Sequence, residues 1–138
     1  AAFSEAWKAG VERDGSSVGV LYLDEVEAQL EDGCGYLRLG AGRAPLLARM
    51  LRARVGKGRD LCLYGRDSTV RFRSGVRPVL AWEDGILTVT LDEAAMEELC
   101  TVLPFHAGKY PLSAVPLSIV LIPTRITDAE GHVLEVIE

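Results

Sequence analysis

Residues 60–90 read DLCLYGRDSTVRFRSGVRPVLAWEDGILTVT, and this stretch decides the fold that we expect. It holds four short runs rich in β-branched and aromatic residues, separated by clusters of Gly, Asp and Ser. Such runs are typical of strands, and such clusters are typical of tight turns. The pattern predicts a meander with strands at 60–64, 69–73, 77–82 and 86–90. Pro78 donates no backbone hydrogen bond, so the third strand is expected at an edge or a bulge.

Strand patterns continue towards the N-terminus. Residues 17–31 alternate between apolar and polar side chains, most clearly in their second half, which predicts a strand with one wet face. This run is long for one strand, so we expect a bend or bulge near Asp24, or a division into two strands. The parity of Asp24 points its carboxylate inward, where it needs an arginine partner unless a bulge turns it out. Residues 32–33 are a hairpin turn signal, and residues 34–39 are the expected return strand.

Helix signals flank the stretch from 60 to 90. Residues 45–55 begin with proline and carry apolar side chains on one face, which predicts a helix. The two glycines at 40 and 42 fit a tight turn before this helix better than a phosphate cradle, because the third glycine of the dinucleotide fingerprint is absent. Residues 90–93 form a capping box and predict a second helix that ends near Val102. Residues 1–13 are a weaker helix candidate.

The C-terminal part predicts a long loop followed by strands. Residues 104–116 form the longest irregular stretch, residues 117–122 an apolar central strand, and residues 132–137 a final strand. Residues 124–126 are expected to extend the central strand beyond Pro123. We therefore expect an α+β fold with a predominantly antiparallel curved sheet or partial barrel and two main helices, in a single domain that covers residues 1–138.

Charge is distributed unevenly along the chain. Residues 43–77, which we call the basic middle, hold ten of the fifteen Lys and Arg residues and two acids, and so carry +8. Residues 1–42 carry −5 (three bases, eight acids) and residues 78–138 carry −8 (two bases, ten acids). The total is −5, which argues against a general nucleic-acid binder, because such domains are usually strongly basic.

Four arginines of the basic middle are candidate ligand-binding residues. Arg49 and Arg52 lie on the expected wet face of the first helix, and Arg71 and Arg73 share one face of an expected strand. Arginine presents a planar fork that suits carboxylates and phosphates. If helix and strand adjoin, the four would line one groove for an anion or a nucleic acid. The alternative, which we favour, is that the basic middle faces the acidic flanks, within the monomer or across a dimer.

The loop at 104–116 is a second candidate site, because long ordered loops are disproportionately functional. His106, Lys109 and Tyr110 would supply an acid or base, a cation and a hydroxyl group. Packing around its prolines would equally make the loop a structural lid. The sequence contains no group of residues with the spacing of a metal site, and we expect neither a metal nor a cofactor.

The three cysteines are far apart and odd in number, so we expect buried free thiols in a reducing compartment, the cytoplasm. No secretory signal is visible, and no apolar stretch is long enough to span a membrane. The function that we expect is a non-catalytic binding or interaction protein that associates with itself through a charge-complementary surface. The alternatives are binding of a small anion or a nucleic acid through the arginines, nucleic acid being the less favoured, and a small enzyme with its site at 104–116.

Overall fold

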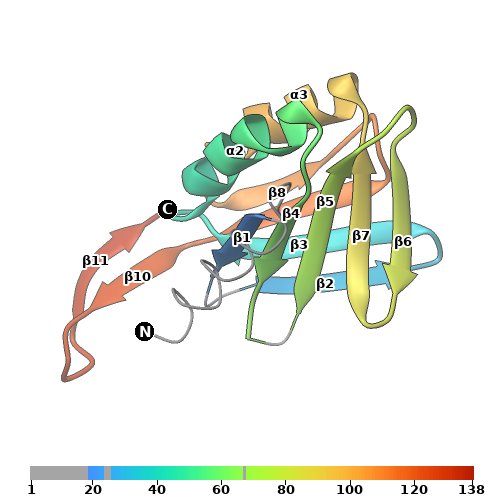
Figure 1. Cartoon of the computed structure of the whole chain (residues 1–138). Coiled ribbons are helices and arrows are strands. Elements are labelled where there is room, and N and C mark those ends of the chain that lie inside the picture. Colours follow the sequence, from blue (N-terminus) through green and yellow to red (C-terminus); the bar gives the residue numbers. More distant parts are fainter. Residues whose placement is uncertain (1–18, 24–25, 67) are drawn as a thin grey trace.

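The computed structural model describes residues 19–23, 26–66 and 68–138, and within them the chain forms two mixed β-sheets, a two-stranded hairpin and two α-helices (Figure 1). The helix candidate at 1–13 and the position of Asp24 lie outside the described residues. The expected long strand at 17–31 is divided, as the break near Asp24 suggested, and its two described parts belong to different sheets.

The first sheet, sheet A, has five strands in the order β1-β4-β5-β7-β6. Their bounds are Gly19–Tyr22 (β1), Leu61–Tyr64 (β4), Thr69–Ser74 (β5), Ile86–Leu91 (β7) and Val79–Glu83 (β6). β1 pairs with β4, and β5 pairs with β7, in parallel, whereas the other two neighbours are antiparallel. Alternate residues such as Leu63, Phe72 and Val89 are fully buried and give this sheet one inner face.

The second sheet, sheet B, has four strands in the order β2-β3-β9-β8. Their bounds are Val26–Glu31 (β2), Cys34–Gly40 (β3), Leu117–Ile122 (β9) and Gly108–Pro111 (β8). β2 and β3 form the expected hairpin, and β3 runs parallel to β9, which occupies the central position that its apolar sequence predicted. Leu37 and Ile119 face each other in this register and are both fully buried.

The expected predominantly antiparallel curved sheet or partial barrel is wrong. The structure has two separate open sheets, and both are mixed. The meander is wrong as well, because β7 lies between β5 and β6. Burial gives the physical reason: β7 buries Leu87, Val89 and Leu91, whereas β6 follows a proline and is mostly exposed. The more apolar strand takes the central place, and β6 takes the edge that Pro78 predicted.

The two expected helices are present. α2 (Ala44–Ala53) starts with proline in its first turn and is followed by a 3-10 turn, η1 (Val55–Lys57). α3 (Glu93–Val102) begins two residues later than the capping box predicted, because Asp92, not Thr90, is the N-cap: its side chain accepts a hydrogen bond from the backbone N–H of Ala95 at 2.8 Å.

The helices and the two sheets enclose one hydrophobic core. Buried residues of α2, α3 and both sheets belong to a single cluster. The strands of the two sheets cross in Figure 1, and β2 packs against strands of sheet A. In the same view, α2 and α3 lie above the strands of sheet B. Gly35 of β3 marks a close approach, since a Cβ there would meet a methyl group of Leu80 at 2.6 Å.

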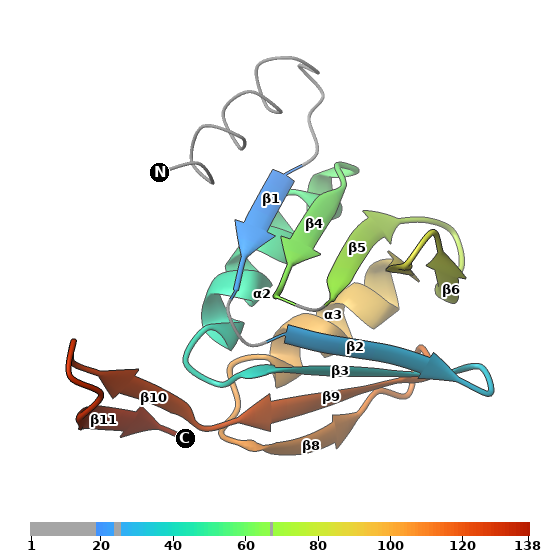
Figure 2. The ribbon, with the colours of Figure 1, turned by 90° about the horizontal axis from the view of Figure 1, so that it is seen from below.

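The remaining two strands stand apart from this body. β10 (Thr124–Thr127) and β11 (Val133–Ile137) pair only with each other and project from the rest of the described chain (Figures 1 and 2). β10 was expected as an extension of β9, but after Pro123 the chain leaves sheet B. No described helix is long and apolar enough to cross a membrane.

Candidate functional site

The four candidate arginines lie on two different faces of the molecule. Arg49 and Arg52 are exposed on α2, whose buried side packs into the core. Arg71 and Arg73 point to the outer face of sheet A, because the intervening Phe72 points into the same core. The structure therefore brings Arg71 and Arg73 together on one face and keeps them apart from Arg49 and Arg52.

The local partners of these arginines differ as well. Arg52 pairs with Glu97 of α3, with 2.7 Å between Nη1 and Oε1. Arg71 is bound to the carboxylate of Asp60 through Nε and Nη2, and this hydrogen bonding raises the pKa of Arg71 above its usual value. Arg73 donates from Nε to the hydroxyl of Thr90 at 3.2 Å and has no carboxylate partner in the described part of the chain.

Among the described residues, few cations of the basic middle form an ion pair. Across residues 19–23, 26–66 and 68–138, Arg52 is the one member of the basic middle that pairs with an acid of the flanking segments. Exposed cations of the basic middle without an acidic partner among the described residues are Arg43, Arg49, Lys57, Arg59, Arg66 and Arg77. Within the described part of the chain, the expected pairing of the basic middle with the acidic flanks is therefore limited to one ion pair.

The loop at 104–116 is more regular than expected, because Gly108–Pro111 forms the edge strand β8. His106 is exposed, and its Nδ1 lies 2.9 Å from the backbone oxygen of Glu138. The Tyr110 hydroxyl donates to the backbone oxygen of His106 at 2.6 Å, and its ring packs edge-on against Phe105 with centroids 5.4 Å apart. These contacts are structural ones between neighbouring segments.

The described residues form no catalytic arrangement around His106 and Lys109. The Lys109 side chain is exposed, and its ammonium group has no hydrogen-bond partner within the described residues. Three surface hollows found between described residues lie elsewhere, and the loop at 104–116 lines none of these three. The far end of the loop is fixed to α3, since the Glu98 carboxylate accepts hydrogen bonds from the backbone of Ser113 and Ala114.

The expectation of three buried thiols is correct for two cysteines. Burial raises the pKa of both the Cys62 and the Cys100 thiol. Cys34 is exposed instead, because it is the first residue after the turn between β2 and β3. All three are free thiols.

Four of the exposed large hydrophobic side chains in the described part of the chain lie on the hairpin of β10 and β11, which the sequence did not single out as a site. Its exposed hydrophobic residues are Ile126 (40%), Val133 (52%), Leu134 (67%) and Val136 (44%). The signal was present: residues 133–137 are apolar on both parities, which is typical of a central strand with no wet face. In this structure the strand has one neighbour and no covering layer among the described residues.

The base of the hairpin is fixed beside the start of α2. The backbone N–H of Gly42 donates to the Thr124 hydroxyl at 2.9 Å. A Cβ at Gly42 would lie 3.2 Å from the Ile137 side chain, so the turn that precedes α2 touches both strands of the hairpin. The exposed Arg43, which follows Gly42 in this turn, thus lies close to the base of the hairpin.

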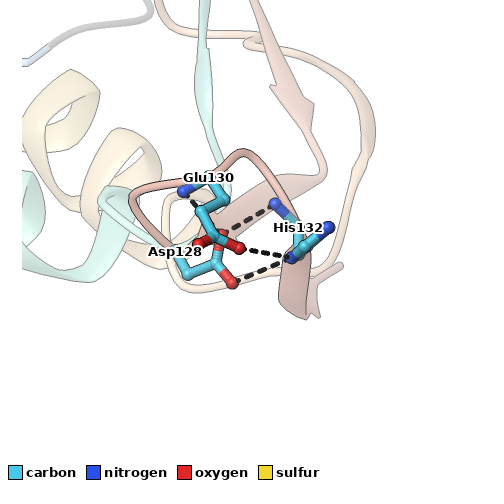
Figure 3. A group of neighbouring side chains, drawn as sticks. All are labelled: Asp128, Glu130 and His132. Atoms are coloured by element: carbon cyan, nitrogen blue, oxygen red, sulfur yellow. Dashed lines mark hydrogen bonds and ion pairs between the residues drawn. The ribbon is translucent and has the colours of Figure 1, made fainter.

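The tip of the hairpin is stabilised by Asp128 (Figure 3). Its Oδ1 accepts hydrogen bonds from the backbone N–H groups of Glu130 and His132, each at 2.9 Å, and its Oδ2 lies 3.2 Å from the Nδ1 of His132. These hydrogen bonds hold the pKa of Asp128 below its usual range, the bond from His132 first among them. The ligand atoms of Asp128, Glu130 and His132 lie within 4.8 Å of one another, as they do in metal sites. However, Glu130 and His132 are exposed, Asp128 is only half-buried, and the hydrogen bonds of the Asp128 carboxylate are those expected in a turn.

Comparisons with known proteins place the fold but not the function. The sequence matches no known protein family and no curated protein. Among solved structures, the chain is similar to Drosophila Suppressor of Fused, with a TM-score of 0.52 and 12% sequence identity. The similarity covers 76% of this chain and 28% of that chain, so this chain corresponds to about a quarter of that protein's length. The likeness concerns the arrangement of helices and strands.

Proposed function

We propose that the protein is a non-catalytic interaction protein that associates with itself through the β10–β11 hairpin. The observation that carries this proposal is the set of exposed apolar side chains on a two-stranded hairpin that has no covering layer among the described residues. A hairpin of two strands is marginally stable in water when it stands alone. Covering its apolar side chains with a second molecule would stabilise both the hairpin and the assembly.

Charge supports a second copy of the chain as the partner. Residues 123–138 carry one arginine and four acids, a net charge of −3 with His132 neutral. The basic middle keeps exposed cations that have no acidic partner in the described residues. Among them are Arg43, which directly precedes α2, and Arg49, which lies on α2. An acidic apolar arm and a basic helix face are complementary surfaces.

The position of the two surfaces favours a closed dimer. Because the hairpin base contacts the turn before α2, the two complementary surfaces lie next to each other on one molecule. A two-fold axis between them would place each hairpin on the other subunit's α2, which is an isologous contact. Such a dimer closes and does not continue into a filament.

Substitutions on the hairpin test the proposal. The double variant Leu134→Ser/Val136→Ser removes apolar area from the interface without opening the core, since both side chains are exposed. We expect its dimer dissociation constant to rise by about tenfold or more, the equivalent of losing part of two apolar contacts. Sedimentation equilibrium measures this constant directly. The matched control is Val76→Ser, which truncates a side chain that is 97% exposed on the β5–β6 turn, away from the hairpin.

Charge reversal tests the second half of the interface. Glu135→Lys and Arg49→Glu should each weaken association, and the double variant should recover part of the loss, because the two charges are complementary across the interface. Equal dissociation constants for wild type and all of these variants would contradict the proposal.

We also propose that the protein functions in a reducing compartment, the cytoplasm. The three free thiols support this location, because disulfides are rare there.

A further inference from the structure

The outer face of sheet A carries an open hollow of about 500 Å³ beside the turn between β5 and β6. Its polar lining, which defines what we call the Arg73 hollow, consists of Arg73, Ser74, Arg77, Glu83, Thr88 and Thr90. We infer that the Arg73 hollow binds a small oxyanion, the phosphate or carboxylate group of a soluble ligand. This site is separate from the β10–β11 hairpin and does not depend on self-association.

Arg73 is oriented before any ligand arrives. It faces Thr90 in the parallel register of β5 and β7, and its Nε donates to the Thr90 hydroxyl at 3.2 Å. This hydrogen bond leaves both terminal nitrogens of the guanidinium group without a partner among the described residues. A phosphate or carboxylate can therefore accept two hydrogen bonds from one fixed, planar group.

Arg71 lies on the same strand and the same face as Arg73, but its charge is neutralised. Its guanidinium group is already bound to the Asp60 carboxylate. Arg73 lacks such a carboxylate in the described chain, and Arg77 adds a second, exposed cation at the rim. Glu83 is the acid of the hollow, and its field acts on Arg71. Arg73 and Arg77 therefore leave the hollow with an excess of positive charge over Glu83.

The shape of the hollow is fixed by two small residues. A Cβ at Gly75 would lie 2.5 Å from the Thr90 side chain, and the backbone N–H of Gly75 donates to Leu91 at 3.0 Å, so the turn lies directly against β7. Ala81 faces Thr88 across the antiparallel pair of β6 and β7, which leaves space above a threonine that is only 4% exposed. The hydroxyl groups of the lining can donate to an oxyanion that Arg73 holds.

An NMR titration of the isotope-labelled full chain tests the site. Inorganic phosphate and acetate are the probes, each added at constant ionic strength. We expect saturable shifts at the Nε of Arg73 and at the backbone amides of Gly75 and Thr90. Saturation with phosphate alone assigns a phosphoryl ligand, saturation with acetate alone assigns a carboxylate ligand, and either result supports the oxyanion site.

Variants decide whether the arginines carry the binding. Arg73→Ala and Arg77→Ala should each weaken binding of the effective probe by about tenfold, the loss of one charge-assisted contact. Arg73→Lys keeps the charge but loses the fork, and should bind with intermediate affinity. Arg66→Ala removes an exposed cation from the turn between β4 and β5, at the opposite end of β5 from Arg73, and should bind like wild type. Arg77 is exposed in a turn, so its variant keeps the test decisive even if Arg73→Ala fails to fold.

The inference is overturned by either of two results. One is a titration that never saturates and shifts the exposed arginines of α2 as much as Arg73. The other is saturable binding that Arg77→Ala and Arg73→Lys both leave unchanged.

Discussion

Glu98 shows how a single side chain fixes a segment that the sequence left open. Its carboxylate accepts hydrogen bonds from the backbone N–H groups of Ala114 and Ser113 and from the Ser113 hydroxyl, all at 2.7 to 2.9 Å. The bond from Ala114 is the foremost of the interactions that hold the pKa of Glu98 below its usual range. One charged residue of α3 thus accepts hydrogen bonds from the backbone of the loop between β8 and β9, a segment that contains no helix or strand.

Replacing this carboxylate should lower stability in a pH-dependent manner. We expect Glu98→Gln to reduce the free energy of unfolding at pH 7 by about 1 kcal/mol, the scale of a partly exposed charged hydrogen bond. Because the pKa of Glu98 is lower in the folded state, its contribution is present above the unfolded pKa of about 4.3 and disappears as pH falls through the folded pKa. Urea unfolding of both proteins between pH 7 and pH 3 measures the difference.

The control for this prediction is Glu97→Gln on the same helix. Glu97 forms an exposed ion pair with Arg52, and exposed ion pairs contribute little to stability. A Glu98→Gln variant whose stability follows wild type at every pH would show that the loop is held by its apolar contacts alone.

Residue types predicted part of the candidate sites. The alternation Arg71-Phe72-Arg73 correctly placed both arginines on one face of a strand. Their different partners could not be predicted, because Asp60 reaches Arg71 from the residue before β4, whereas Thr90 reaches Arg73 from β7. Arg77 lines the Arg73 hollow only because the turn between β5 and β6 brings it there, and a single sequence does not give the position of a turn in space.

At the scale of elements, α3 shows how local signals compete. The capping box predicted Thr90 as the N-cap, whereas the structure has Asp92, and both residue types are good caps. The sheet decides between them: Thr90 is held in β7, opposite Arg73, so the helix begins only after Asp92. Local sequence therefore predicted the helix, and tertiary pairing set its first residue.

The cap makes a direct prediction for stability. Asp92→Ala should lower the free energy of unfolding by about 1 kcal/mol, because the N–H of Ala95 loses its acceptor. Asp92→Asn keeps an oxygen at this position and should retain most of the stability. Thermal and urea unfolding of the three proteins compare them. If the alanine and asparagine variants were equally stable, the hydrogen bond to Ala95 would not be what stabilises the start of α3.

The order of strands could not be predicted from their sequences alone. All four runs of residues 60–90 form strands at or near the expected positions. Strands adjacent in sequence were expected to be adjacent in the sheet, yet the more apolar β7, and not β6, pairs with β5. Parallel pairing of β5 with β7 and of β3 with β9 follows from such long-range choices, and this pairing is what makes both sheets mixed.

At the scale of the whole molecule, the uneven charge of the sequence remains visible on the surface. The base of the acidic C-terminal hairpin contacts the turn before α2, and ion pairs between the basic middle and the acidic flanks are scarce among the described residues. A charge distribution of this kind attracts complementary surfaces and loses that attraction as salt screens it. In the proposed dimer, the exposed apolar side chains of the hairpin would supply the part of the association that salt does not weaken.

The salt dependence of the oligomeric state tests the central claim most directly. Sedimentation equilibrium of the wild-type chain at micromolar concentration should show a dimer at low ionic strength. The dissociation constant should rise when the ionic strength reaches about 0.15 M, where the Debye length is about 8 Å. A protein that stays monomeric at both ionic strengths, across the micromolar range, would contradict self-association through the β10–β11 hairpin.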